Sequence, residues 1–282
     1  MTLPSPLSYA RRRVAGRPFV GAIVAILMLA APAGRAQTQR SEMSGDTAAV
    51  AAGRTFTVEA GATLIAEGGT AIDAGVAAIF AAAVVEISHF GLGGEAPIAL
   101  YHAKTGDVVV INGQGPAPAA ADPRLFAGAS AIPCNGPLGA TIPAVVDAAA
   151  LALERYGTKS LADVLAPAIG LADGFPMYEF LHRYLVSERA ACEPFQDTMA
   201  TYYPGGRVTP TGEVFRQPNL AATLRRLVAA ERAALEAGAT REAAIRAGRD
   251  AFYTGDIAAR IAAAVQQAGG VMTADDLARY EG

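Results

Sequence analysis

Residues 90–112 read FGLGGEAPIALYHAKTGDVVVIN and join a glycine-rich turn to two apolar runs. Gly91, Gly93 and Ala96 match the spacing G-x-G-x-x-A, which in dinucleotide-binding proteins places a pyrophosphate against a helix N-terminus. That loop requires a strand before it and a helix after it, because the free N–H groups at the start of the helix bind the phosphate. The order of the neighbouring elements therefore decides what the turn is for.

The turn lies between a helix and a strand, which is the reverse of that order. Residues 70–73, Thr-Ala-Ile-Asp, form a capping box that predicts a helix start, and no charge follows from Ala74 to Val85. Apolar residues recur at helical spacing, so we expect a core helix that ends near Glu86. A helix C-terminus presents carbonyl groups, which repel a pyrophosphate. We therefore expect the glycines to allow a sharp turn and a close backbone approach.

The residues after the turn predict a β-hairpin. Pro97 to His102 and Asp107 to Asn112 are the two strands, and residues 104–106, Lys-Thr-Gly, are the turn between them. Neither strand alternates polar with apolar residues, so both faces are expected to be covered. The predicted fold class is α+β, with helices on one face of the hairpin and a second sheet on the other. Residues 112–118, NGQGPAP, then form a polar, rigid loop, and loops at strand ends commonly carry chemistry.

The later part of the chain is predicted to be mostly helical, with glycines ending several of the helices. The expected elements are helices over residues 143–156 and 161–171, a helix capped by Asn219, a helix from Gly255-Asp256 to Gly269-Gly270, a capping box at residues 273–276, and a surface hairpin over residues 202–218.

The composition excludes some classes of function. The 282 residues are 52% hydrophobic and 17% charged, with a net charge of −3, which suits one or two globular domains with ample core. The charges are scattered and aromatic residues make up 7% of the chain. Little is therefore available to bind a nucleic-acid backbone or to stack on bases, and nucleic acid is not an expected partner.

The N-terminus has the features of a secretory signal. Basic residues at 11–13 and Arg17 precede an uncharged run over 18–34, and Gly34-Arg35-Ala36 is a small-x-small cleavage site. An uncleaved membrane anchor is the alternative, although the uncharged run is at the short edge of what spans a bilayer. The consecutive arginines also permit twin-arginine export.

The expected organisation is a signal peptide at residues 1–36, a flexible lead-in at 37–52 and a domain over 53–282. The mature protein is expected to be periplasmic or secreted, without stable membrane insertion. Export permits a disulfide between Cys134 and Cys192, because such bridges persist in oxidising compartments. Two isolated buried thiols are the alternative.

Common catalytic motifs are absent from the sequence. It has no G-x-S-x-G elbow, no H-E-x-x-H and no C-x-x-C, and its three histidines lie far apart. No residue is therefore predicted to be catalytic or to bind a metal. His102 is expected to face a strand neighbour, and His89, beside the glycine turn, is the better candidate for a binding role. Pattern alone predicts an exported, mixed α/β protein.

Several stretches of the sequence recur together in one known family. They are GGTAIDA (68–74) with VVE (84–86), the glycine turn, the hairpin, APA (117–119), ALERYG (152–157), VLAPAI (164–169), AFYTGDIA (251–258) and GGVMTADDLARY (269–280). In this order they resemble the γ-glutamyltransferase (γ-glutamyl transpeptidase) family of N-terminal-nucleophile hydrolases. Each piece alone is weakly specific, but the ordered set is strongly specific and runs from about Val50 to the end of the chain.

The resemblance implies a fold and a chemistry. Members fold as αββα sandwiches, and the matching stretches place this chain in the N-terminal half of the large subunit. The chain is therefore expected to be an incomplete sandwich that is helix-rich in its second half. They are made as precursors that cut themselves, and the new N-terminal threonine of the small subunit is the nucleophile, with its own amine as base. They take a γ-glutamyl group from glutathione or a related amide and give it to water or another amine. No metal or organic cofactor is implied.

Two departures limit what the resemblance implies. The sequence has no Thr-Thr-His segment, so the nucleophile is expected on a missing C-terminal half or small subunit, which is the expected partner. The family's arginine for the substrate α-carboxylate lies in an Arg-Glu-x-Ala-Pro stretch, and here residues 114–118 read QGPAP. Because Gln114 donates weaker hydrogen bonds than a guanidinium, weaker binding of a γ-glutamyl carboxylate is expected.

Gln114, Gly113 and His89 are the residues expected to bind a small-molecule amide or peptide substrate, unless Gln114 merely ends a strand. The approach to the glycine turn around His89 also departs from the family's Pro-His-Ser-Ser-Gly-like pattern. Three interpretations stay open: half of a γ-glutamyltransferase, half of an amidohydrolase or acylase with a different acyl group, or a non-catalytic remnant. Without its other half, the chain is expected to leave apolar faces of the hairpin uncovered and to aggregate.

Overall fold

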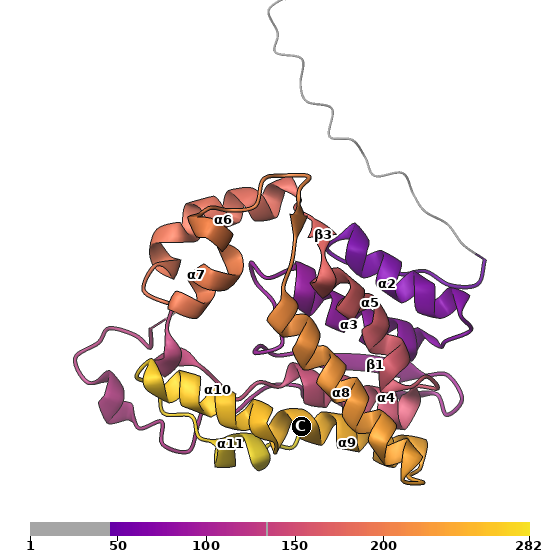
Figure 1. Cartoon of the computed structure of the whole chain (residues 1–282). Coiled ribbons are helices and arrows are strands. Elements are labelled where there is room, and N and C mark those ends of the chain that lie inside the picture. The colour runs from indigo at the N-terminus through magenta and orange to yellow at the C-terminus, as the bar shows by residue number, and fades with distance from the viewer. Residues whose placement is uncertain (1–45, 134) are drawn as a thin grey trace, which may run out of the picture. The chain divides into compact units, whose positions relative to one another are not determined.

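The computed structural model describes residues 46–133 and 135–282. The predicted signal peptide, most of the lead-in and Cys134 lie outside the described residues, so the predicted disulfide stays a prediction. The described part is α+β and helix-rich, as predicted (Figure 1). None of its helices is both long and apolar enough to cross a bilayer.

The α-helices and strands of the described residues are, in chain order, α2 (Thr55–Ala66), α3 (Ala71–Val85), β1 (Ile98–His102), β2 (Asp107–Ile111), α4 (Val145–Tyr156), α5 (Leu161–Asp173), β3 (Phe175–Pro176), α6 (Glu179–Cys192), α7 (Gln196–Tyr202), β4 (Val214–Phe215), α8 (Pro218–Glu236), α9 (Arg241–Tyr253), α10 (Asp256–Gln267) and α11 (Ala274–Ala278).

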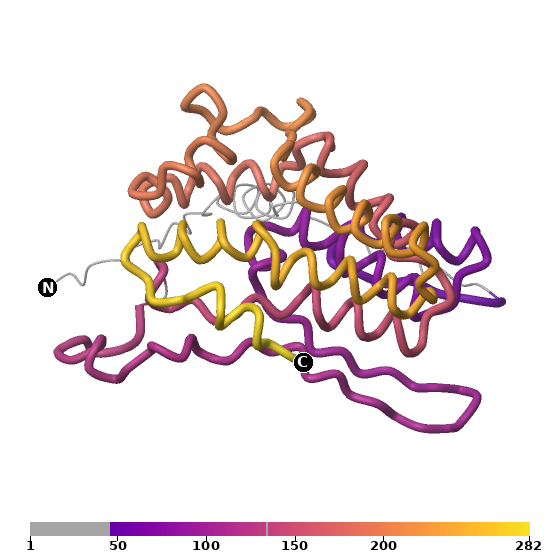
Figure 2. The backbone as a smooth tube through the Cα atoms, turned by 60° about the horizontal axis from the view of Figure 1, so that its bottom comes forward, coloured from indigo at the N-terminus to yellow at the C-terminus, as the bar shows by residue number. Residues whose placement is uncertain are grey.

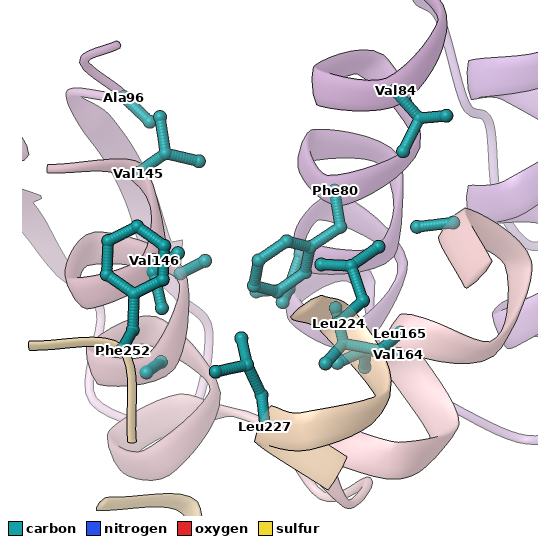
Figure 3. Close-up of a cluster of buried hydrophobic side chains, with 14 of the residues drawn as sticks. Phe80, Val84, Ala96, Val145, Val146, Val164, Leu165, Leu224, Leu227 and Phe252 are labelled. Atoms are coloured by element: carbon teal, nitrogen blue, oxygen red, sulfur yellow. The ribbon is translucent and has the colours of Figure 1, made fainter. Parts of the chain in front are cut away.

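Helix α3 is buried over most of its surface, as its lack of charge predicts. Phe80 and Val84 are fully buried, and helices α2, α4 and α5 pack on α3. Figure 3 shows Phe80 pointing into a cluster that includes Leu165 of α5 and Leu224 of α8. Burying one side chain of this size contributes about 1.5–3 kcal/mol. The helix is therefore the centre of the hydrophobic core.

The carboxylate of Asp73 fixes the start of α3 to a distant loop. It closes the predicted capping box with Thr70. The same carboxylate accepts N–H groups from Thr158 at 2.8 Å and Lys159 at 3.0 Å, and the Thr158 hydroxyl at 2.8 Å. Burial alone would raise the pKa of Asp73, but the N–H groups of Lys159, Thr70 and Thr158 and the Thr158 hydroxyl outweigh it, so the pKa lies below its ordinary value.

The predicted hairpin forms, but with one covered face instead of two. β1 and β2 pair antiparallel from Ile98 opposite Ile111 to His102 opposite Asp107. Leu100 and Ile111 are buried on the face that packs on α4. Figure 2 shows the hairpin lying beneath the helical layer. The other face is exposed and consists of Ala99, Tyr101, Val108 and Val110.

The prediction that both faces of the hairpin are covered is therefore wrong for the described residues. Both faces are apolar, which is why the strands do not alternate, but α4 supplies a partner for one face alone. Tyr101 is 64% exposed, Val108 is 73% exposed and Val110 is 69% exposed. The expectation that an apolar face stays uncovered in this chain is confirmed.

Two predictions about the later chain need correction. Asn219 does not cap a helix, because α8 begins one residue earlier at Pro218 and Gln217 occupies the N-cap position. Proline is favoured at the first helical position, where its missing N–H costs nothing. Residues 202–218 do not form a hairpin with themselves, because Val214–Phe215 pairs with the distant strand Phe175–Pro176. The other expected helices and the capping box at Thr273 are confirmed.

We expect Asp73→Asn to lower the free energy of unfolding by about 2–3 kcal/mol, because an amide cannot accept every hydrogen bond that the carboxylate accepts. Urea denaturation at neutral pH measures this loss. Asp163→Asn is the matched control, because Asp163 closes a capping box with Ser160 alone and should cost about 0.5–1 kcal/mol. Equal losses for the two variants would contradict the role given to Asp73.

The difference between wild type and Asp73→Asn should also depend on pH. The pKa of Asp73 is lowered by folding, so its contribution is present above its unfolded pKa of about 3.9 and is lost as the pH falls through its folded pKa. We therefore expect the two urea midpoints to converge below about pH 4. A difference that stays constant down to about pH 2 would contradict this assignment.

Candidate functional site

The loop after β2 is held tightly by backbone contacts. Gly113 has a φ of +55°, in the left-handed region that favours glycine, and its carbonyl accepts the N–H of Ala96 at 2.8 Å. A Cβ at Gly115 would overlap the carbonyl of Ile142. The N–H of Ile142 donates to Pro116 at 3.0 Å. Glycine is therefore required at both positions, for conformation at Gly113 and for space at Gly115.

Gln114 lies in this loop with an exposed side chain. Its carbonyl accepts the hydroxyl of Tyr280 at 3.2 Å, which joins the strand end to a residue far away in the sequence. Gln114 lines a hollow of about 690 Å³ together with Asn112, Asp276, Arg279 and Tyr280. The polar loop predicted from the sequence is therefore one wall of a concave site.

The part of the hollow formed by residues 276–281 carries charge. Asp276 is committed to structure, because its carboxylate accepts the N–H of Ala119 at 3.1 Å and the Thr273 hydroxyl at 2.7 Å. Burial alone would raise the pKa of Asp276, but the Thr273 hydroxyl and the Ala119 N–H outweigh it and hold the pKa below its ordinary value. Arg279 is 72% exposed, and its Nε donates to the Asp275 carbonyl at 3.1 Å while Nη2 lies 4.0 Å from the Asp275 carboxylate, so the outer N–H groups of the guanidinium stay available to a ligand. The Glu281 side chain also lines the hollow.

Of the three predicted binding residues, Gln114 is the one that lines the hollow. Gly113 precedes it in the loop, and neither Gly113 nor His89 is among the lining residues. His89 has an exposed ring, with Nε2 at 3.2 Å from the Glu86 carboxylate and Nδ1 at 2.7 Å from the Ser88 hydroxyl. Glu86 in turn accepts the Thr57 hydroxyl at 3.0 Å. The His89 ring therefore extends a contact between α2 and the end of α3.

His102 is paired with Asp107 across the sheet, as predicted, but its ring contacts residues outside the two strands. Its Nδ1 lies 3.0 Å from the hydroxyl of Thr105 in the hairpin turn, and its ring is 5.6 Å from that of Tyr156 in α4. The ring reaches Tyr156 because the covered face of the hairpin packs on α4. It reaches Thr105 because that residue lies in the turn that follows β1. The ring thus helps to seat the hairpin on the helical layer.

The glycine turn behaves differently from its prediction. The turn is sharp, with the N–H of Gly94 donating to Gly91 at 2.9 Å. A Cβ at Gly91 or Gly93 would meet open space, so the predicted close approach is wrong at these two positions. The turn instead borders a hollow of about 850 Å³, lined in part by Phe90, Leu92, Tyr202 and Phe215. The close backbone approaches occur at Gly113 and Gly115.

The side chains that line the hollow beside Gln114 can bind a ligand, but none of them is hydrogen-bonded to another as a nucleophile to its base. The hollow beside Gln114 offers an amide and a guanidinium, which can hold a carboxylate or an amide through hydrogen bonds, whereas the Tyr280 hydroxyl already donates to the Gln114 carbonyl. Within residues 46–133 and 135–282, no cluster of three or more histidine, cysteine, aspartate or glutamate side chains could hold a metal ion. Arg279 and Tyr280 were missed as site residues from the sequence. Their signals were that they follow a capping box and that they end the family-like stretch GGVMTADDLARY (269–280).

The sequence matches a family model described as gamma-glutamyltranspeptidase over residues 57–282. It is 36% identical over 216 residues to a glutathione hydrolase-like YwrD proenzyme of Bacillus subtilis, covering 75% of this chain and 38% of that protein. The chain therefore spans about a third of the length of the curated relatives that it matches.

Solved structures give the same result. The chain superposes on the gamma-glutamyltranspeptidase of Helicobacter pylori with a TM-score of 0.75 at 27% identity, covering 85% of this chain and 66% of that one. It also superposes on a cephalosporin acylase from Bacillus halodurans with a TM-score of 0.67 at 26% identity, covering 85% of this chain and 46% of that one. The predicted α+β fold, an incomplete N-terminal-nucleophile hydrolase sandwich, is confirmed.

We expect Gly115→Ala to lower the free energy of unfolding by about 1–3 kcal/mol, because the added Cβ must displace the Ile142 carbonyl or the loop. Gly93→Ala is the matched control, since its Cβ meets open space and its effect should stay within about 0.5 kcal/mol. Thermal or urea unfolding of both variants checks the expectation. A Gly93→Ala loss as large as that of Gly115→Ala would contradict it.

Proposed function

The chain belongs to the gamma-glutamyltranspeptidase family, and we propose that it forms the N-terminal part of an enzyme that cleaves or transfers a γ-glutamyl or related acyl group from an amide such as glutathione. The observation that carries the proposal is the family match over residues 57–282. We further propose that residues 1–36 direct export, so that the enzyme acts in the periplasm or outside the cell.

The nucleophile in this proposal comes from polypeptide outside the sequence. The family's nucleophile is an N-terminal threonine in a Thr-Thr-His-like segment, and this sequence contains no such segment. A threonine hydroxyl at an N-terminus can be activated by its own amine, so the chain described here need supply neither nucleophile nor base. Its proposed contribution is the framework and one wall of the substrate site.

The exposed face of the hairpin supports this division of roles. Tyr101, Val108 and Val110 form an apolar face that water covers in the described chain. Sheets in sandwiches pack face to face through such side chains, and an open apolar face with free edges promotes aggregation. We propose that a second sheet from the nucleophile-bearing polypeptide covers this face.

The hollow beside Gln114 is the proposed site for the acyl group. Gln114 supplies neutral hydrogen bonds, worth about 1 kcal/mol, where the family's arginine supplies charge-assisted bonds worth about 1.5–3 kcal/mol. Arg279, which also lines the hollow, is the positive charge proposed to replace part of the missing guanidinium's contribution. Gly113 holds the loop in its turn. His89 is proposed only as a more distant contact, for a long substrate.

A second candidate function is an acylase or amidohydrolase whose acyl group lacks an α-carboxylate. Gln114 favours this candidate, because a neutral amide has no charge with which to select a carboxylate. The likeness to a cephalosporin acylase also supports it. Comparing γ-glutamyl anilides with simple acyl anilides as substrates of the assembled enzyme distinguishes the two, and no turnover of either would support a non-catalytic remnant.

We expect Gln114→Arg, in the enzyme assembled with its nucleophile-bearing segment, to raise kcat/KM for a γ-glutamyl anilide about tenfold. The gain comes from a bidentate, charged contact to the α-carboxylate. Gln196→Arg, on helix α7, adds the same charge away from the hollow and should change kcat/KM by less than about twofold. Unchanged or slower turnover by Gln114→Arg would remove Gln114 from the carboxylate-facing position.

We expect Val108→Lys combined with Val110→Lys to prevent assembly with the nucleophile-bearing segment, because the charges would be buried against a sheet. The stability of the isolated chain should change by less than about 0.5 kcal/mol, since both side chains are exposed there. Co-purification of the two polypeptides measures assembly. Val186→Lys, on an exposed site of α6, is the control. Normal assembly of the double variant would contradict the proposal that a second sheet covers the exposed face of the hairpin.

A further inference from the structure

Three neighbouring carbonyls in the loop after β2 each accept a hydrogen bond. The carbonyls of Gly113 and Pro116 accept backbone N–H groups at 2.8 Å and 3.0 Å. The carbonyl of Gln114, between them, accepts the side-chain hydroxyl of Tyr280 at 3.2 Å. The peptide unit between Gln114 and Gly115 is therefore held by the Tyr280 side chain. A substitution at Tyr280 can remove this hydrogen bond without altering the backbone of the loop.

Tyr280 is well placed to hold this carbonyl. The residue is 5% exposed, and its ring centroid lies 5.7 Å from that of Tyr253. Burial raises the pKa of the Tyr280 phenol, so the hydroxyl is protonated and donates at neutral pH. The tyrosine thus has a fixed ring and an available donor.

The backbone of Tyr280 is held in turn by a buried ion pair. Arg249 donates from Nη2 to the Tyr280 carbonyl and from Nε to the Asp147 carboxylate at 2.5 Å. The second oxygen of Asp147 accepts the N–H of Gly282 at 3.0 Å. Arg249 also lies over the Tyr253 ring, 4.7 Å from its centroid. Together these contacts fix the backbone at the Tyr280 carbonyl and at the Gly282 N–H, on the C-terminal side of the tyrosine.

This arrangement contributes more to orientation than to stability. The Asp147 and Arg249 side chains are 8% and 17% exposed, and a buried ion pair contributes little net stability compared with apolar packing. Burial alone would lower the pKa of Arg249, but the Asp250 and Asp147 carboxylates outweigh it and keep the guanidinium charged. The pair therefore holds two backbone groups of the segment 280–282 at fixed positions.

We propose that Tyr280 is a positioning residue for Gln114. Its hydroxyl fixes the Gln114 peptide unit, and so the direction in which the Gln114 side chain enters the hollow, while Arg249 and Asp147 hold Tyr280 in place. The contact between Tyr280 and the loop does not depend on whether the protein is an enzyme. Its effect on substrate binding rests on the proposed function.

Tyr280→Phe tests the proposal by removing the hydroxyl and keeping the ring. In the chain labelled with nitrogen-15, the Gly115 amide reports directly, because its nitrogen belongs to the same peptide unit as the Gln114 carbonyl. We expect its chemical shift to change, and the amide exchange of Ala96 and Ile142 to speed up about fivefold as the loop loosens. Tyr203→Phe is the matched control, because it removes a hydroxyl that donates to the Leu185 carbonyl at 2.7 Å.

The control should leave the Gly115 shift and both exchange rates unchanged. Arg249→Lys keeps the charge but cannot hold Asp147 and the Tyr280 carbonyl together, so it should move the Gly115 shift in the same direction as Tyr280→Phe. An unchanged Gly115 shift in Tyr280→Phe, or an equal change in Tyr203→Phe, would overturn the proposal.

The assembled enzyme gives the functional outcome. Tyr280→Phe should raise KM about fivefold and leave kcat within about twofold, because ground-state orientation of Gln114 is weakened while the nucleophile is untouched. A fall in kcat with unchanged KM would overturn the link to binding. If the assembled enzyme turns over no amide at all, the proposed function fails, while the Gly115 shift still decides the loop geometry.

Discussion

The burial of α3 is the constraint on which the rest of the described structure depends. A helix without charge from Ala74 to Val85 can be stable only when other elements cover it, and α2, α4 and α5 pack on it. Asp73 then fixes its first turn to the loop between α4 and α5 through bonds to Thr158 and Lys159. Hydrophobic burial sets where the helices lie, and this one carboxylate sets their register at one end.

The hairpin follows from that helical layer and carries the candidate site at its end. Because α4 covers one face, Leu100 and Ile111 are buried and the strand end is held rigidly. The backbone then turns at Gly113. Gln114 lines a hollow that is also lined by residues of the segment 276–281. The other face, with Val108 and Val110, stays apolar and exposed. One element thus provides a ligand wall and an uncovered surface.

Much of the local structure was predictable because it depends on near neighbours. The capping boxes at Thr70 and Thr273 and the turn at Gly106 are set by residues within a few positions of each other, and all three form. The N-cap of α8 was placed two residues too late, at Asn219, because Pro218 takes the first helical position and Gln217 becomes the N-cap. The pairing of Val214 with Pro176 was missed because it joins distant segments.

The sequence predicts the fold class, the buried helix and the β-hairpin with its turn, because these depend on local pattern and on ordered motifs. The packing of whole elements determines which face of the hairpin is buried and places His89 outside the hollow that Gln114 lines. It also determines that the close backbone contacts occur at Gly113 and Gly115 and not at Gly91 and Gly93. It also brought Tyr280 to Gln114. The physical reason is that such contacts depend on how whole elements pack, and no short stretch of sequence records the distance between them.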